Sequence, residues 1–505
     1  MTAQVSIRSF SERGVGFGTS GVRATVEALT DEVCFAYAAA FLGVLEQRGP
    51  ARGGARTVAL GHDLRPSSPR MAAACIAACA AKGARVVLCG ALPTPALAHF
   101  AIQRGLPAIV ITGSHIPFDR NGIKFYTSAG EILKDDETAI AAATVELDET
   151  AFDRGMLRNP PALPGADPAA LELYRQRYLT FFPSGTLRGR RIGVYEHSSV
   201  ARDVATDLLR TLGAEVVSLG RTDTFVPVDT EAVSEADQRQ GQAWARAHRL
   251  DAIVSTDGDA DRPLIADETG TWLRGDLVGM LCARFVGART VVTPVSSNTA
   301  VERWGVFPKV IRTRIGSPYV LAAMADAARG GEAPVVGYEA NGGFLLGSAV
   351  ERGGGGRAGV HPPPQVTGSL AALPTRDALL PILSLLAMAA ERGAPLSRLS
   401  AGLPARFTAS DRLQSFETAR SRQLLAQLAS GPGALSAFFG ELGQVAEVNQ
   451  VDGLRVTLAS GDIVHLRPSG NAPELRCYGE ADAPERAAEL VRWGLAAAAG
   501  SGRMP

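Results

Sequence analysis

The sequence predicts three similar α/β domains with mixed, mainly parallel sheets, followed by a C-terminal α+β domain. Short β-branched runs alternate with stretches rich in Ala and Leu, which is the pattern of strand–helix–strand units. The strand-like runs are apolar throughout, as expected when helices cover both faces of a parallel sheet. The 505 residues are enough for three or four domains of usual size.

The first α/β domain is expected over residues 1–160. Three apolar runs are separated by two helical stretches, and Gly83 ends the first of these helices. A right-handed crossover would place the three strands in one sheet. We expect strands at 57–61, 85–89 and 108–112, and helices at 69–82 and 94–105.

The same alternation starts again twice, which predicts a second domain over 161–270 and a third over 271–390. The repetition is one of architecture, because no matching residues recur between the copies. The second domain has expected strands at 191–195, 214–217 and 251–255, with a helix at 201–212. The third has expected strands at 290–293 and 334–337, and a helix near 377–390.

The pattern changes in the C-terminal part, which predicts an α+β domain over 391–505. Two alternating runs, 456–458 and 462–466, flank the turn 459–461 and form an expected antiparallel hairpin. A closing helix is expected over 484–499. The Gly- and Pro-rich segment 352–364 is expected to be a flexible loop or local insertion.

The composition favours a small-molecule partner. Lys and Arg total 51, as do Asp and Glu, so there is none of the basic excess of a nucleic-acid binder. No apolar run reaches the ~18 residues of a membrane span, and no signal peptide is recognised at the N-terminus. The scattered cysteines suggest buried thiols in a reducing cytoplasm, which is the expected location. They are Cys34, Cys75, Cys79, Cys89, Cys282 and Cys477.

The segment 112–124 follows an apolar strand and carries Ser114, His115 and Lys124. Open α/β sheets bind ligands at the carboxyl ends of their strands. A serine there is exposed and can act as a nucleophile if a base stands near, and His115 and Lys124 are candidate acid/base groups. The alternative for this segment taken alone is an ordinary polar loop.

A second loop, 255–262, carries Asp257, Asp259 and Asp261 at alternate positions after another apolar strand. Carboxylates separated by small residues can converge on one hard cation, and three such charges repel unless they are neutralised. The loop is not an EF-hand, because Arg262 stands where that motif requires Gly. The alternative is a solvated acidic turn.

Three further segments are candidates for substrate binding. Arg467 and Arg476 flank 468–475, where the backbone amides of Ser469, Gly470 and Asn471 could form a nest for an anion. Glu339 and Asn341, on a Gly-flanked turn after a strand, could hydrogen-bond sugar hydroxyls, although a structural turn is as compatible with the pattern. The Gly-rich loop 16–23 ends in Arg23 and lacks the strand–helix context of a dinucleotide-binding fingerprint.

Taken together and in this order, these segments resemble the α-D-phosphohexomutase family over about residues 16–480. The resemblance is carried by Gly18-Thr19-Ser20-Gly21-Val22-Arg23, Thr112-Gly113-Ser114-His115, Asn121-Gly122-Ile123-Lys124, Asp257-Gly258-Asp259-Ala260-Asp261-Arg262 and Arg467-Pro468-Ser469-Gly470. It implies four domains around a central cleft and an intramolecular phosphotransferase that moves phosphate between the 1 and 6 positions of a hexose.

The resemblance also implies roles for individual residues. Ser114 is the expected phosphoserine. Asp257, Asp259 and Asp261, with an oxygen of Ser114 or its phosphate, are expected to hold one Mg²⁺ per chain. Arg23, His115 and Lys124 are expected around the transferring phosphoryl group, with Arg262 beside them and Glu339 and Asn341 on the sugar. Residues expected to hold the non-reacting phosphate are Arg467, Ser469, Gly470, Asn471 and Arg476.

The chain departs from the family pattern at several positions. Ile116 stands for Asn after the histidine, Asn471 and Ala472 stand for Thr-Glu in the phosphate loop, and Ala24 stands for Gly. In the sugar loop, Asn341 stands for a common Ser and Gly343 for a common His. These last two changes bear on substrate identity, because the resemblance implies that this loop distinguishes sugar epimers.

The expected activity is interconversion of mannose 6-phosphate and mannose 1-phosphate through a hexose 1,6-bisphosphate. Glucose phosphates are the first alternative substrates, and glucosamine phosphates are less favoured. A non-catalytic sugar-phosphate-binding protein and a Mg²⁺-dependent phosphatase are the alternatives from other classes. The protein is expected to be a monomer or homodimer without nucleic-acid or membrane partners.

Overall fold

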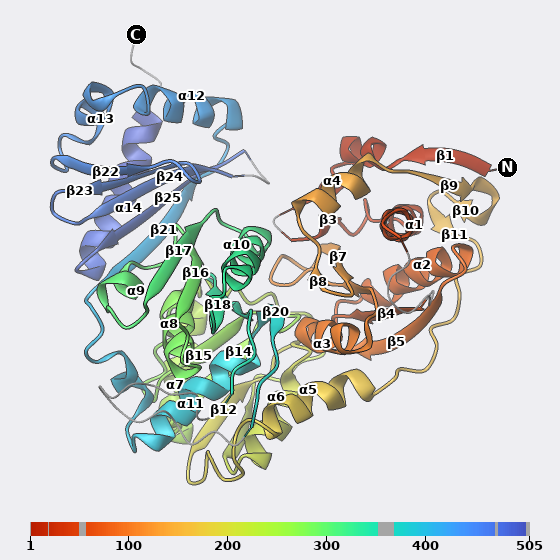
Figure 1. Cartoon of the computed structure of the whole chain (residues 1–505), viewed down its shortest axis with the longest axis horizontal. Helices are drawn as coiled ribbons and strands as arrows, with labels where there is room; N and C mark the ends of the chain where they lie inside the picture. Colours follow the sequence, from red (N-terminus) through yellow and green to blue (C-terminus); the bar gives the residue numbers. More distant parts are fainter. Residues whose placement is uncertain (1, 19, 50–56, 352–367, 470–472, 501–505) are drawn as a thin grey trace.

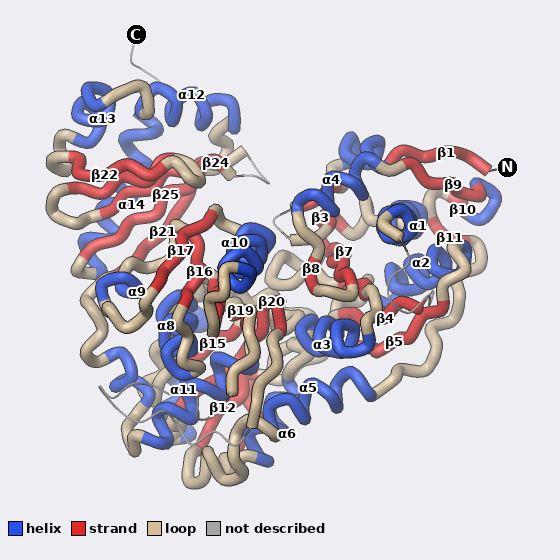
Figure 2. The backbone as a smooth tube through the Cα atoms, in the orientation of Figure 1, coloured by secondary structure: helices blue, strands red, loops and turns tan. Residues whose placement is uncertain are grey.

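The computed structural model describes residues 2–18, 20–49, 57–351, 368–469 and 473–500. The chain forms three α/β units and a C-terminal α+β unit (Figure 1). The N-terminal and C-terminal units lie at the two ends of the view, joined through the second unit (yellow to yellow-green) and the third unit (green to cyan) (Figure 1). Helices and strands alternate in the first three units, and strands dominate the centre of the last (Figure 2).

The first unit is built on a mixed sheet with strand order β2-β3-β7-β6-β4-β5. Strands β4, β5 and β6 are parallel, and β7 runs antiparallel to β6. Helices α1 and α2 pack against each other, and α3 packs on α5 (Ala169–Leu179) of the second unit. The strands are β2 (Gly16–Phe17), β3 (Val22–Thr25), β4 (Thr57–His62), β5 (Arg85–Ala91), β6 (Ala108–Ile111), β7 (Arg120–Thr127) and β8 (Gly130–Glu131), and the helices are α1 (Asp31–Gln47), α2 (Ser68–Ala81), α3 (Thr94–Arg104) and α4 (Lys134–Ala142).

The second and third units repeat this arrangement with strand orders β13-β12-β14-β15 and β17-β16-β18-β19-β20. The second contains α5 (Ala169–Leu179), β12 (Arg191–Tyr195), α6 (Arg202–Thr211), β13 (Glu215–Leu219), α7 (Glu235–His248), β14 (Ala252–Thr256) and β15 (Pro263–Ala266). The third contains α8 (Gly275–Phe285), β16 (Thr290–Pro294), α9 (Ala300–Arg303), β17 (Lys309–Thr313), α10 (Ser317–Arg329), β18 (Val335–Tyr338), β19 (Phe344–Leu346), β20 (Leu373–Asp377) and α11 (Leu379–Glu391).

One connection is equivalent in the three units and positions the functional residues. In each unit a central parallel strand is followed by a short loop and an antiparallel strand: β6 to β7, β14 to β15, and β18 to β19. We name these connections the serine loop (residues 112–119), the acidic loop (257–262) and the sugar loop (339–343). Each therefore starts at the carboxyl end of a buried strand, where such sheets bind ligands.

The C-terminal unit contains an antiparallel sheet of order β21-β25-β24-β23-β22, with α14 packed against β25 and β21. Its apolar core is separate from the large core that joins residues of the other three units. Polar contacts fasten it to the third unit; for example, the Thr299 N–H of the third unit donates to Glu480 Oε1 on β25 at 3.0 Å. Its elements are β21 (Phe407–Leu413), α12 (Thr418–Leu428), α13 (Pro432–Phe439), β22 (Val445–Asn449), β23 (Leu454–Leu458), β24 (Ile463–Pro468), β25 (Leu475–Ala481) and α14 (Pro484–Gly500).

The structure confirms the expected strands and helices of the three α/β units to within a few residues, together with the C-terminal hairpin and the closing helix. Two elements differ in detail from the expectation. Short strands β2 and β3 pair at the two ends of the Gly-rich loop, Gly16 with Arg23, and Asp377 ends β20, two residues before α11 begins. The expected flexible segment 352–364 lies outside the described residues. Among the helices that the structure describes, none is long and apolar enough to cross a membrane.

Short segments complete the N-terminal part of the molecule. Strand β1 pairs antiparallel with β9, and β10 pairs with β11, at the edge of the first unit (Figure 1). Helices α1 and α4 lie against each other and cover one side of this region. The bounds are β1 (Thr2–Ser6), β9 (Thr144–Asp148), β10 (Phe152–Asp153) and β11 (Met156–Leu157).

A buried histidine in the C-terminal sheet predicts loss of stability in acid. His465 Nε2 lies 2.5 Å from the Asp452 carbonyl oxygen and must donate to it, while its buried Nδ1 has no hydrogen-bond partner within the described ranges. Burial lowers the pKa of His465 from 6.5 to about 4. Between these values the unfolded chain binds the extra proton, so stability falls as pH falls from 6.5 towards 4. We expect the melting temperature of His465→Gln, measured from pH 7.5 to 5, to fall less steeply than that of the wild type; equal slopes would contradict this.

Candidate phosphoryl-transfer and metal site

The acidic loop brings three buried carboxylates together after β14. Asp257, Asp259 and Asp261 each offer an oxygen, and these oxygens lie within 4.8 Å of one another. The three side chains have almost no exposure to solvent. Ala260, between two of them, has a positive φ of 59°, which turns the backbone so that alternate side chains can converge.

The Oδ2 atoms of Asp259 and Asp261 accept hydrogen bonds from protein donors. Lys124 Nζ donates to Asp259 Oδ2 at 2.7 Å and to Asp261 Oδ2 at 2.6 Å. Thr94 Oγ1, at the start of α3, donates to Asp259 Oδ2 at 2.6 Å. The Oδ1 atoms of Asp259 and Asp261 are buried and have no hydrogen-bond partner among the described residues. Buried carboxylate oxygens without partners fit a hard cation such as Mg²⁺.

The electrostatics agree with a cation at this position. Burial, followed by the charges of Asp259 and Asp261, raises the pKa of Asp257 well above its usual value. Burial also acts to raise the pKa of Asp261, but the neighbouring cations, foremost Arg376 and then Lys124, hold it well below its usual value. Asp257 is therefore the member of the cluster whose charge is least compensated by the protein.

The serine loop places its hydroxyl directly on the acidic cluster. Ser114 Oγ donates to Asp257 Oδ2 at 2.5 Å, joining the carboxyl edges of the first two sheets. Ser114 has a positive φ of 54°, an unusual conformation for a residue other than Gly. Its backbone N–H donates to Thr112 Oγ1 at 2.8 Å, which fixes the turn. A strained residue held by its surroundings at such a position points to function.

One buried arginine, Arg65, holds the serine loop through hydrogen bonds to its backbone. Arg65 donates to the carbonyl oxygens of Ser114 (3.0 Å) and Ile116 (2.5 Å), and also to those of Pro117 and Arg120. Asp63 accepts from the Arg65 guanidinium at 3.2 Å and from the Gly113 N–H at 3.0 Å. With its guanidinium satisfied in this way, Arg65 acts as a rigid template for the loop.

Gly113 should not tolerate even alanine. A Cβ at this position would lie 2.3 Å from Arg65 Nε, and the contacts of Arg65 prevent it from moving aside. We expect Gly113→Ala to lower stability by about 1–3 kcal/mol and to reduce activity by displacing the hydroxyl of Ser114. Gly165→Ala is the matched control, because a Cβ there meets open space. Equal melting temperatures and activities for the two variants would contradict the template role of Arg65.

His115 and two arginines surround the hydroxyl with donors. Arg262 Nη1 donates to His115 Nδ1 at 2.9 Å, and this cation together with burial lowers the pKa of His115 to about 3. The imidazole is therefore neutral and carries its proton on Nε2, which suits it as a donor to a phosphate oxygen. Arg23 donates to the Thr112 carbonyl oxygen, and burial lowers its pKa to about 10, so it remains a cation.

The sugar loop is tied to the acidic loop by an arginine from β20. Glu339 is buried, and its Oε2 accepts from Arg376 Nη1 at 3.1 Å. The same guanidinium donates to Asp261 Oδ2 at 2.7 Å. Asn341 Oδ1 accepts from the Gly343 N–H at 2.9 Å, so this side chain shapes the loop. The structure thus joins Glu339 to the reaction centre.

The expected phosphate-holding residues lie apart from this cluster, on the C-terminal sheet. Arg467 and Arg476 are opposite each other on β24 and β25. Arg467 Nε donates to Asp452 Oδ2 at 2.8 Å, and the same oxygen accepts from the Ile315 N–H of the third unit at 2.9 Å. The Ser469 N–H donates to the Glu474 carbonyl oxygen at 2.8 Å. Gly470 and Asn471 lie outside the described residues.

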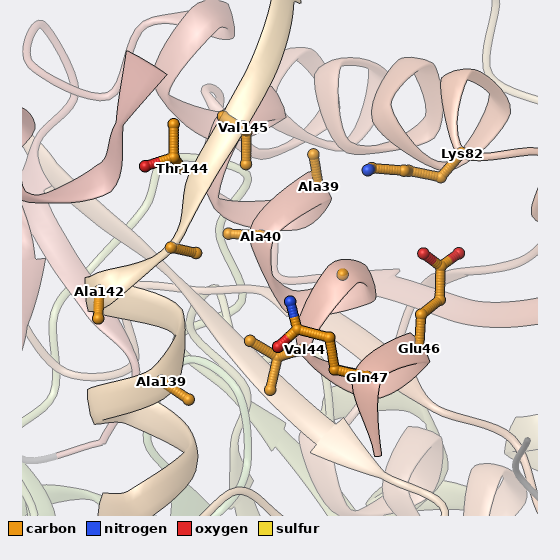
Figure 3. A pocket seen from close by; sticks show the side chains of 12 residues that line it. Ala39, Ala40, Val44, Glu46, Gln47, Lys82, Ala139, Ala142, Thr144 and Val145 are labelled. Carbon is orange, nitrogen blue, oxygen red and sulfur yellow. The ribbon is translucent and has the colours of Figure 1, made fainter. Parts of the chain in front are cut away.

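A separate pocket on the first unit does not share these residues. It has a volume of about 710 Å³ and lies between α1, α4 and β9 (Figure 3). Small and apolar side chains such as Ala39, Val44 and Ala139 line much of it, with Lys82 and Glu46 at one side. This lining offers no cluster of carboxylates or of cations, so the pocket does not compete with the acidic loop as the reaction centre.

Several residues of the site carried no motif that marked them in the sequence. Asp63 and Arg65 follow β4 at its carboxyl end, so their place after an apolar strand was a usable signal. Thr94 and Arg376 had no such signal, because their contacts with the acidic loop depend on how separate units pack. The missed residues are Asp63, Arg65, Thr94 and Arg376.

Family models match the chain along most of its length. They describe the α/β/α domains I, II and III and the C-terminal domain of phosphoglucomutase/phosphomannomutase. The matched residues are 14–151, 176–270, 274–407 and 419–493.

Full-length relatives and a solved structure agree with these matches. The chain is 48% identical over 490 residues to a phosphomannomutase of Sinorhizobium fredii, covering 96% of this chain and 98% of the relative. It is 45% identical over 485 residues to a phosphomannomutase of Salmonella muenchen, covering 95% of each. A phosphoglucomutase/phosphomannomutase family protein of Burkholderia thailandensis has the same fold, with a TM-score of 0.72, 21% identity, and coverage of 99% of this chain and 98% of that one.

Proposed function

Because the chain belongs to the phosphoglucomutase/phosphomannomutase family, we propose that it is a phosphomannomutase, interconverting mannose 6-phosphate and mannose 1-phosphate. The observation that carries this proposal is the 2.5 Å contact between Ser114 Oγ and Asp257 Oδ2. It sets a nucleophilic hydroxyl beside a cluster of carboxylates that fits a cation. The two full-length relatives named above support mannose phosphates as the substrates.

The proposed cofactor is one Mg²⁺ per chain. Its ligands would be Asp257, Asp259 and Asp261 together with an oxygen of Ser114 or its phosphate. When bound, Mg²⁺ offsets negative charge on the oxygens of the transferring phosphoryl group. The buried Oδ1 atoms of Asp259 and Asp261, which receive no hydrogen bond from the described residues, support this assignment.

The protein groups around Ser114 are suited to phosphoryl transfer, because this reaction requires positioning and charge stabilisation more than covalent chemistry. The phosphoryl group passes from Ser114 Oγ to the free sugar hydroxyl, and the P–O bond to serine breaks as the new P–O bond forms. Lys124 is the candidate to move the proton between the sugar oxygen and Ser114 Oγ. Arg23, Arg262 and neutral His115 supply donors to the phosphoryl oxygens.

The product of that transfer is a hexose 1,6-bisphosphate, which also serves as the proposed activator. It must present its other phosphate to Ser114 before the second transfer, while the first phosphate is held elsewhere. Arg467, Ser469, Gly470, Asn471 and Arg476 are the proposed holders. The separate core of the C-terminal unit and its polar contacts to the third unit support a unit that moves while the sugar reorients.

Glucose phosphates are the second candidate substrates, because Glu339 and Asn341 offer hydrogen bonds that hydroxyls of either sugar could satisfy. A phosphatase would use the same groups and transfer phosphate to water. The experiment that separates these functions compares mannose 1-phosphate, glucose 1-phosphate and glucosamine 1-phosphate as substrates, with free phosphate measured in parallel. We expect the highest kcat/KM for mannose 1-phosphate and little free phosphate; rapid release of phosphate without isomerisation would contradict the proposal.

A further inference from the structure

Arg376 is a buried cation that connects all three α/β units at the reaction centre. It lies on β20, and its side chain is 3% exposed. Its Nε and Nη2 donate to Asp261 Oδ2 at 3.1 and 2.7 Å, while Nη1 donates to Glu339 Oε2 at 3.1 Å. Nη2 also lies 3.4 Å from Ser20 Oγ of the first unit. One side chain therefore joins the acidic loop, the sugar loop and the N-terminal hairpin.

The space that Arg376 occupies depends on glycine at the end of the sugar loop. A Cβ at residue 343 would lie 2.6 Å from Arg376 Cδ and 2.9 Å from its Cγ. The backbone φ of Gly343 is not in the left-handed region, so the backbone itself does not demand glycine. The pairing of Phe344 with Asp377 between β19 and β20 brings the two positions together. The position of the Arg376 side chain therefore depends on the absence of a Cβ at residue 343.

The contacts of Arg376 also leave one face of Glu339 available. Arg376 holds Oε2, and Oε1 receives no hydrogen bond from the part of the chain that the structure describes. A carboxylate fixed through one oxygen can accept from a sugar hydroxyl through the other. The planar guanidinium can contact two carboxylates at once, which the single ammonium of lysine does less well.

We propose that Arg376 is a positioning residue that sets the choice of sugar by holding Glu339 against Asp261, in space left open by Gly343. The inference rests on the proposed function, since it requires that Glu339 meets a sugar hydroxyl. Losing the guanidinium would free Glu339 to move, so the hydroxyl arrangement of the sugar would matter less. A role that is only structural would instead lower the rates with all sugars by one common factor.

The first test compares kcat/KM for mannose 1-phosphate and glucose 1-phosphate in the wild type, Arg376→Lys and Arg376→Met. We expect Arg376→Met to lose about 10-fold or more in kcat/KM for the preferred sugar. In Arg376→Met, the ratio of kcat/KM for the two sugars should change about fivefold towards one. Arg376→Lys should give a ratio between those of the wild type and Arg376→Met. Arg406→Met is the matched control, because Arg406 is a buried arginine that pairs with Glu480 and Asp482 at the edge of the C-terminal unit. It should leave the ratio unchanged.

The second test is a double-mutant cycle between residues 343 and 376. Gly343→Ala should reduce kcat/KM and lower the melting temperature, because its Cβ meets the stem of Arg376. In the Arg376→Gly background the same change should have little effect, since the colliding atoms are gone. Additive effects on both measurements would show that the two positions are independent and would overturn the inference.

The outcomes separate this inference from the proposed function. If the wild type isomerises neither sugar phosphate, the proposed function fails first. If the wild type is active and Arg376→Met lowers kcat/KM for both sugars by the same factor, the role of Arg376 in sugar choice is wrong while the proposed function stands. If the ratio of kcat/KM between the two sugars changes in Arg376→Met and stays the same in Arg406→Met, the role of Arg376 in sugar choice is supported.

Discussion

Ser114→Ala should lower kcat by about 10⁴-fold or more, because the alanine has no oxygen to carry the phosphoryl group. The effect should fall on kcat, since the groups that bind the sugar phosphate are unchanged. The measurement is steady-state turnover of mannose 1-phosphate with the bisphosphate present. Melting temperatures of the two proteins should be similar, because the hydroxyl donates a single hydrogen bond, to Asp257.

The matched control for this variant is Ser384→Ala. Ser384 is also buried, but it lies within α11, where its hydroxyl contacts Cys282. We expect its turnover to stay within about threefold of the wild type, as for a substitution outside the site. Substantial turnover by Ser114→Ala would show that another group carries the phosphate.

Asp259→Asn should lower kcat by about 10³-fold. The change replaces a buried carboxylate that meets Lys124 and Thr94 and whose Oδ1 is a candidate metal ligand. An amide has no charge to balance a divalent cation and binds it more weakly. Added Mg²⁺ should therefore raise the melting temperature of the wild type clearly and that of Asp259→Asn much less.

Asp267→Asn is the matched control for this second variant. Asp267 is buried in the turn after β15, where its Oδ1 accepts from the backbone N–H groups of Thr269 (2.9 Å) and Thr271 (3.1 Å). An asparagine can keep these bonds through its own Oδ1, so turnover and the Mg²⁺ response should change little. Equal responses of the two variants to Mg²⁺ would argue against a metal site in the acidic loop.

Much of the site could be predicted from the sequence because its loops follow short, apolar strands. The run ending at Ile111 leads directly to Ser114, and the run ending at Thr256 leads to Asp257. Helix-covered parallel strands place such endings on one edge of a sheet. The local sequence pattern therefore predicts the positions of the serine and acidic loops, although it does not predict the contact between them.

The rest could not be predicted, because it depends on packing between distant segments. Arg376 is near Gly343 only because β20 pairs with β19, and no local pattern specifies that pairing. Arg65 acts on a loop that follows it by about 50 residues, through bonds to backbone carbonyl oxygens that any sequence would offer. Asp377 stands at the boundary of the helix expected near 377–390, and no local pattern shows that it ends a strand or that its carboxylate accepts from Tyr174 at 2.6 Å.

The most direct measurement follows a labelled phosphate from the protein to the sugar. The protein would be phosphorylated on Ser114 with a radioactive phosphate, freed of excess reagent, and mixed with unlabelled mannose 1-phosphate and Mg²⁺. We expect the label to leave the protein at least as fast as kcat and to appear in mannose 1,6-bisphosphate and mannose 6-phosphate. Label that stays on the protein during turnover, or that appears only as inorganic phosphate, would contradict phosphoryl transfer through Ser114.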